Sequence, residues 1–81
     1  MKVKVFYFSS IKDIVKKSNE EITLENNSSV SELLKVLKEK YPEISDHLNN
    51  IMIAINEEYS TLETTLKNGD TVALIPPVSG G

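Results

Sequence analysis

The sequence predicts one α+β domain in which a single long helix covers one face of a mixed sheet of four or five strands. Segments with apolar residues at every second position alternate with segments of helical periodicity. Only one helical segment is long enough to cover a sheet, so the opposite face is expected to stay partly open. A length of 81 residues suits one domain with a small core.

The first strand is predicted at residues 2–8, where the two faces alternate strictly. The period places Phe6 and Phe8 on one face together with Lys4. The residues expected to point into the core are Val3, Val5 and Tyr7.

A short helix and a second strand are expected next. Ser10 and Asp13 have the spacing of a capping box, which predicts a helix running to about residues 18–19. Residues 21–25 then alternate like a strand, with Ile22 and Leu24 directed inward.

The main helix has the strongest local signals. Ser29 and Glu32 form a capping box at its start, and Pro42 ends it. Residues 43–50 are polar and are expected to form an irregular connection. The apolar stripe of the helix consists of Val30, Leu33, Leu34, Leu37 and Tyr41.

The C-terminal half predicts a short run of strands separated by turns. Residues 51–55 are expected to form a buried strand and residues 59–62 a brief edge strand, with a turn at 56–58 between them. Gly69 supplies a positive φ to a second turn, and residues 71–75 form the last strand. Its alternation adds two residues to the open face, namely Ala73 and Ile75.

Composition excludes several function classes. Without cysteine the chain has no disulfide, thiolate metal site or cysteine nucleophile. A net charge of −3, with lysine but no arginine, argues against nucleic-acid binding. The N-terminus lacks the apolar run of a signal peptide, and no segment reaches the roughly 20 residues that span a bilayer. We therefore expect a cytoplasmic protein that does not enter membranes.

Two polar features are interpreted as structural. His47 is the only histidine and has no neighbouring ligands in sequence, so a surface position is expected, and we predict no metal site. Glu57 and Glu58 are adjacent on a turn, where carboxylates usually serve solvation.

The domain proper is expected to span residues 1–75, followed by an extended flexible tail at 76–81. Two prolines cannot continue a central strand and favour an extended path. Six extended residues reach about 20 Å, enough to carry the C-terminal carboxylate into another protein's active site. The terminal residue, Gly81, is the candidate reactive group. The residues expected to thread a narrow channel before it are Pro76, Pro77, Val78, Ser79 and Gly80.

A carboxylate is unreactive until it is activated, normally as an acyl-adenylate made from ATP. The only glycines are Gly69, Gly80 and Gly81, so the chain has no glycine-rich loop to cradle phosphates. Activation is therefore expected from a separate, ATP-consuming enzyme, and no cofactor is expected on the chain itself.

The whole chain resembles the small subunits of molybdopterin synthase, which are ubiquitin-like sulfur carriers of the β-grasp fold. The most specific match is the C-terminal segment 75–81. Further matching segments are residues 2–8, 29–34, 53–56 and 66–73. The thiamine-pathway carriers share the Gly-Gly end but usually lack the paired prolines.

The resemblance implies a cycle of sulfur transfer. A ubiquitin-activator-like enzyme adenylates Gly81, and a sulfur donor replaces AMP to leave a thiocarboxylate. The tail then enters the large subunit, where its sulfur is transferred to cyclic pyranopterin monophosphate during molybdenum cofactor biosynthesis. The chain is thus the non-catalytic, sulfur-donating subunit of a sulfurtransferase, expected in a two-plus-two heterotetramer.

The resemblance also implies docking through an apolar sheet surface beside the tail, to which Phe8 and Ile75 correspond, with Phe6 as a further candidate. Other functions stay open. The chain could be a protein modifier joined through Gly81 to lysines, a sulfur carrier for thiamine or tRNA thiolation, or an interaction domain whose glycines are incidental.

Overall fold

The alternating and helical segments form a five-stranded sheet with helices, and the structure, a computed structural model, describes residues 1–77. The elements in chain order are β1 (Lys2–Tyr7), α1 (Ser9–Val15), β2 (Asn19–Thr23), α2 (Val30–Lys40), the 3-10 helix η1 (Pro42–Leu48), β3 (Met52–Ile55), β4 (Glu58–Ser60) and β5 (Thr71–Ile75). The last strand has the predicted bounds.

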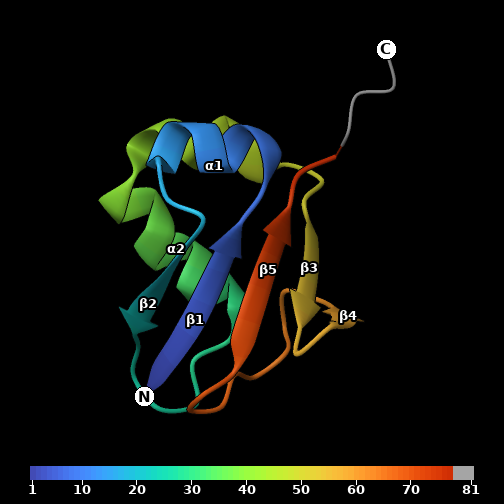
Figure 1. The fold of residues 1–81 in the computed structure, drawn as a ribbon. Helices are drawn as coiled ribbons and strands as arrows, with labels where there is room; N and C mark the ends of the chain where they lie inside the picture. Colours follow the sequence, from blue (N-terminus) through green and yellow to red (C-terminus); the bar gives the residue numbers. More distant parts are fainter. Residues whose placement is uncertain (78–81) are drawn as a thin grey trace.

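The sheet order is β2-β1-β5-β3-β4 (Figure 1). The first and last strands, β1 and β5, lie side by side and parallel, and all other neighbours are antiparallel. A parallel pair needs a crossover connection, and α2 lies within the segment that supplies it. Figure 1 shows α2 behind the sheet and α1 across the end toward which β1 and β5 point. The predicted α+β class and mixed sheet are confirmed.

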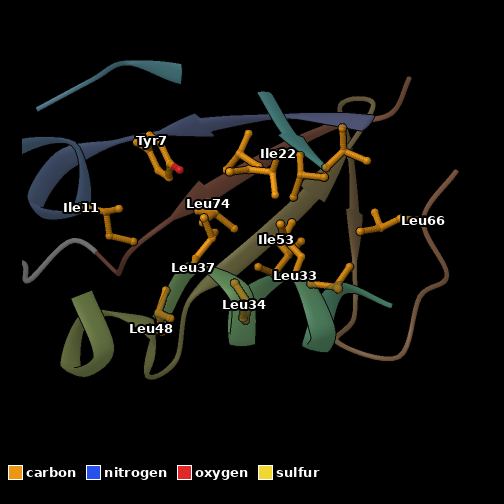
Figure 2. Packing of buried hydrophobic residues seen from close by; sticks show 14 of the residues in the cluster. Tyr7, Ile11, Ile22, Leu33, Leu34, Leu37, Leu48, Ile53, Leu66 and Leu74 are labelled. Atoms are coloured by element: carbon orange, nitrogen blue, oxygen red, sulfur yellow. The ribbon is translucent and has the colours of Figure 1, made fainter. Parts of the chain in front are cut away.

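The core lies between the sheet and α2 (Figure 2). The alternation predicted for β1 is confirmed, because Val3, Val5 and Tyr7 are almost fully buried. The other buried residues of this core include Ile11, Ile22, Leu33, Leu37, Ile53, Leu66, Val72 and Leu74. With one face of the sheet covered in this way, the opposite face is left for other contacts.

The predicted capping box of α2 is confirmed. The backbone N–H of Glu32 donates to Ser29 Oγ at 3.3 Å, and the Ser29 N–H donates to Glu32 Oε1 at 3.3 Å. These bonds satisfy backbone donors at the helix start. The helix ends at Lys40, two residues before Pro42.

The predicted boundaries of α1 and β2 were wrong. Helix α1 begins at Ser9, has no side-chain cap and ends at Val15, where Lys16 turns left-handed with φ of 63°. Because α1 ends early, β2 can start at Asn19 rather than at residue 21. Pairing with β1 already begins at the residue before it, since the Tyr7 N–H donates to the Ser18 carbonyl at 2.9 Å. Pairing with β1 therefore sets the boundary between α1 and β2.

The segment after α2 is not the irregular connection that its polar composition predicts. It forms η1, which buries Ile44 and Leu48. His47 lies on the same helix, and its Nδ1 is 3.1 Å from Ser10 Oγ of α1. Two apolar residues four apart thus dock the helix on the core, a signal too short to stand out in the sequence.

The turn before β5 forms as predicted. Gly69 has φ of +88°, and its N–H donates to the Lys2 carbonyl at 2.7 Å. At the other end of β5, Pro76 is buried and Pro77 is exposed. The sequence predicts that the tail begins at Pro76, and this first residue of the segment is shielded from solvent.

Candidate functional site

The uncovered sheet face is the candidate site, and its residues are identified by strand register. Phe6 pairs with Ala73, Ala73 with Ala54, and Ala54 with Tyr59. Directly paired residues share a face, so these four form one row across β1, β5, β3 and β4. Tyr59 is 74% exposed at the sheet edge.

A second apolar row lies where β5 leaves the sheet. Met52 pairs with Ile75, and Phe8 continues β1 in an extended conformation next to the paired residues Tyr7 and Leu74. Phe8 is 43% exposed and Met52 46% exposed. Large apolar side chains are thus accessible beside the start of the C-terminal tail.

The face is hollowed between the two phenylalanines and the β3–β4 turn, forming a cavity of about 340 Å³. Its lining residues are Phe6, Phe8, Ala54, Glu57, Thr71 and Ala73. The Lys4 ammonium lies 5.9 Å from the centre of the Phe6 ring. The surface is therefore apolar in its middle, with a cation and a carboxylate at its rim.

The structure brings the three predicted interface residues, Phe8, Ile75 and Phe6, to this one face. Of the predicted tail, Pro76 and Pro77 are described, and the remaining four residues lie outside the described range. Those four are Val78, Ser79, Gly80 and Gly81.

Sequence reasoning missed the contributions of β3, β4 and their turn. The face also includes Met52, Ala54, Tyr59 and Glu57. The alternation of β3 places Met52 and Ala54 on one face of the strand and their neighbours on the other. Only the pairing with β5 identifies which face of the sheet this is. No local signal could have supplied that register.

The strongest electrostatic cluster lies on the other, helix-covered side of the sheet, around Glu20. Its carboxylate accepts hydrogen bonds from Tyr7 Oη at 2.5 Å and Tyr41 Oη at 2.7 Å. It also pairs with the ammonium groups of Lys40 at 2.8 Å and Lys17 at 3.3 Å. The cluster links β1 and β2 to the end of α2.

These contacts set the ionisation of the cluster. Burial raises the pKa of Glu20, but the hydrogen bonds from its four partners outweigh this effect and lower the pKa to about 2. Burial, followed by the bond to Glu20, raises the pKa of Tyr7. The hydrogen bond to Glu20 raises the pKa of Lys40, and the bond to Tyr41 raises that of Lys17. The carboxylate stays ionised at neutral pH, which suits a structural role.

Two other kinds of site are absent from the part of the chain that the structure describes. Residues 1–77 contain no group of three His, Cys, Asp or Glu side chains placed to hold a metal ion. No helix among them has the length and apolarity required to cross a membrane.

Comparison with known proteins assigns the family. The model of the ThiS family matches residues 5–81, a range that runs to the terminal glycine. The chain belongs to the ThiS family. Its solved structural neighbours share the ubiquitin-like β-grasp fold, as expected from the resemblance.

Known proteins that resemble this chain in sequence and in structure give the context of this fold. The Mycobacterium tuberculosis protein named molybdopterin synthase sulfur carrier subunit is 37% identical over 82 residues, which cover 100% of this chain and 99% of the relative. A solved complex of subunits 1 and 2 of molybdopterin-converting factor from Helicobacter pylori contains a chain with 34% identity, full coverage of both chains and a TM-score of 0.72.

A third neighbour is the small archaeal modifier protein 1 of Methanosarcina acetivorans. It is 26% identical with a TM-score of 0.85, and the match covers 99% of this chain and 96% of that one. The fold is therefore shared by proteins named for sulfur carriage and for protein modification.

Proposed function

We propose that this chain is the sulfur-carrier small subunit of molybdopterin synthase. One observation carries the proposal. The family model matches the chain through its Gly-Gly end, and the last strand, β5, leaves the sheet beside an exposed apolar face. The resemblance to the Mycobacterium tuberculosis sulfur carrier subunit over the full length supports it.

In this function the C-terminal carboxylate of Gly81 is the working group. A carboxylate oxygen attacks the α-phosphate of ATP on a separate adenylating enzyme, and pyrophosphate leaves. A nucleophilic, sulfide-level sulfur from a donor then attacks the acyl carbon. The bond between this carbon and the phosphate oxygen breaks, AMP leaves with the electron pair, and a thiocarboxylate remains. The chain binds no cofactor of its own, and ATP is consumed by the activating enzyme in the cytoplasm.

The open face supports the delivery step. Phe8, Ile75 and Phe6 form an apolar surface for the large subunit, whose binding directs the tail into the active site. There the sulfur passes to cyclic pyranopterin monophosphate, and two carriers serve the two large subunits of a heterotetramer. The solved complex of subunits 1 and 2 of molybdopterin-converting factor from Helicobacter pylori supports the binding of a small subunit to a large one.

The test is made on protein taken from cells. A fraction heavier by one oxygen-to-sulfur exchange, located at Gly81 by fragmentation, is expected. Extending the chain by one residue after Gly81 should abolish sulfur transfer to the pterin while circular dichroism shows an unchanged fold. Full transfer by the extended chain would overturn the proposal.

A second candidate is a protein modifier, favoured by the similarity to the archaeal modifier protein. Its acyl-adenylate would be attacked by a lysine amine of a target to form an isopeptide bond. The two functions separate in one experiment, because only the modifier leaves a branched remnant on lysines of other proteins in a tryptic digest of the cells. Lys67 is the last lysine and the chain has no arginine, so this remnant is the segment from Asn68 to Gly81.

A further inference from the structure

The two-residue turn between β3 and β4 contains an unfavourable residue. Ile55 pairs with Glu58, so Asn56 and Glu57 alone form the loop. Their φ values are 51° and 71°, both positive, as a type I′ turn requires. Asn is favoured at the first position, but the second strongly prefers glycine because a Cβ crowds the backbone there.

The first turn residue, Asn56, has a structural role that accounts for its presence in the turn. Asn56 Nδ2 donates to Asp70 Oδ1 at 2.9 Å, and Asn56 Oδ1 accepts from the Thr71 N–H at 3.0 Å. These bonds fasten the turn to the start of β5. Glu57 makes no such contact: among residues 1–77 its exposed carboxylate has no hydrogen bond or ion pair. No local contact offsets the strain of a side chain at this position.

Glu57 instead lies at the rim of the open sheet face, which is the candidate docking surface for the large subunit. It lines the cavity of the open face together with Phe6 and Phe8. The next residue, Glu58, lines a different hollow with Thr64 and Lys67. Two adjacent carboxylates thus border different surfaces, and only that of Glu57 adjoins the apolar face.

We propose that Glu57 recognises a lysine or arginine of the protein that covers the open face, and that it orients that protein on the sheet. This inference rests on the proposed function, in which the large subunit is that protein. Apolar rows supply contact area but define the register of the partner weakly, whereas a carboxylate at one place on their rim favours the register that brings a cation of the partner to it. A strained residue that serves binding rather than folding is expected at such a site.

The experiment measures binding and stability together. Calorimetric titration of the large subunit from the same organism is carried out with the wild type, Glu57→Gln and Glu57→Gly, at 50 mM and 500 mM salt. Both substitutions are expected to weaken binding about fivefold at low salt and less at high salt. Glu57→Gly is also expected to raise the melting temperature of the isolated chain by about 4 °C, because glycine relieves the turn.

Glu58→Gln is the matched control, since it removes the same charge one residue away on the other surface. It should bind like the wild type. Binding of Glu57→Gln within twofold of the wild type, or equal weakening by Glu58→Gln, would overturn the inference while leaving the proposed function intact. A wild type that does not bind the large subunit would overturn both.

Discussion

The hydroxyl of Tyr7 donates a 2.5 Å hydrogen bond to Glu20 Oε2, and through it the buried end of β1 is tied to β2. The same carboxylate accepts from Tyr41 and Lys40 at the end of α2. Tyr7 is 1% exposed and directly precedes Phe8. The polar cluster under the sheet therefore anchors the strand end from which the candidate docking surface begins.

Replacing Tyr7 with Phe keeps the ring packing and removes this donor. We expect the free energy of unfolding to fall by about 1–2 kcal/mol, because a largely buried carboxylate loses one partner and keeps its others. Urea denaturation at pH 7 measures the change. Tyr59→Phe, at an exposed ring, is the control and should stay within about 0.5 kcal/mol of the wild type. Equal midpoints for Tyr7→Phe and wild type would contradict the expectation.

The low pKa of Glu20 predicts a stability that depends on pH. Its folded pKa of about 2 lies below the ordinary value of 4.5, so ionised Glu20 stabilises the fold fully above about pH 5. That contribution is lost as the pH falls from 5 toward 2. The stability gap between the wild type and Glu20→Gln should therefore narrow with acidification in urea titrations at pH 7, 5, 4 and 3.

Glu21→Gln serves as the control for this pH series, because the Glu21 side chain is 63% exposed and its ion pair with Lys2 is long, at 3.7 Å. Its gap from the wild type should stay small throughout. If the stability difference between Glu20→Gln and the wild type were constant from pH 7 to pH 3, folding would not change the pKa of Glu20, and the prediction would be wrong.

Phe8→Ala tests the docking surface. Phe8 is 43% exposed, so its removal should cost little folding stability, but binding to the large subunit should weaken at least about tenfold if the ring fills a pocket of the partner. Calorimetric titration gives the affinity. Val36→Ala, which truncates a 37% exposed side chain on α2, should leave the affinity unchanged. Comparable affinities for Phe8→Ala and wild type would locate the interface elsewhere.

Ile44→Ala tests whether η1 belongs to the core. Ile44 is 0% exposed, and truncation of a buried isoleucine costs about 2–5 kcal/mol. In an irregular exposed connection the same change would cost less than about 0.5 kcal/mol. Denaturant unfolding decides between these values, with the exposed neighbour Glu43→Ala as the comparison.

Gly69→Ala tests the turn before β5. At φ of +88° a Cβ is strained, although nothing lies within 4 Å of the place it would occupy. We expect a loss of about 1–2 kcal/mol from backbone strain alone. Gly69→Asn should lose less, because Asn tolerates the left-handed region better. If both variants were as stable as the wild type in urea, strain at this residue would not matter.

Features whose hydrogen bonds close within a few residues could be predicted from sequence. The Ser29–Glu32 cap, the stop before Pro42 and the left-handed turn at Gly69 all belong to this group. The alternation of β1 is also local, since successive side chains of a strand point to opposite faces whatever the strand pairs with. The chemistry expected of Gly81 also rests on a local sequence, and it stays a prediction.

Features that depend on contacts between distant segments could not be predicted from the sequence. The start of β2 was set by pairing with β1, and η1 formed because Ile44 and Leu48 found space on the core. The open face, the candidate docking surface, is the clearest case. Met52 and Tyr59 join Phe6 and Phe8 only through the register of β3 with β5 and β4, because pairing between strands far apart in the chain decides which side each strand presents.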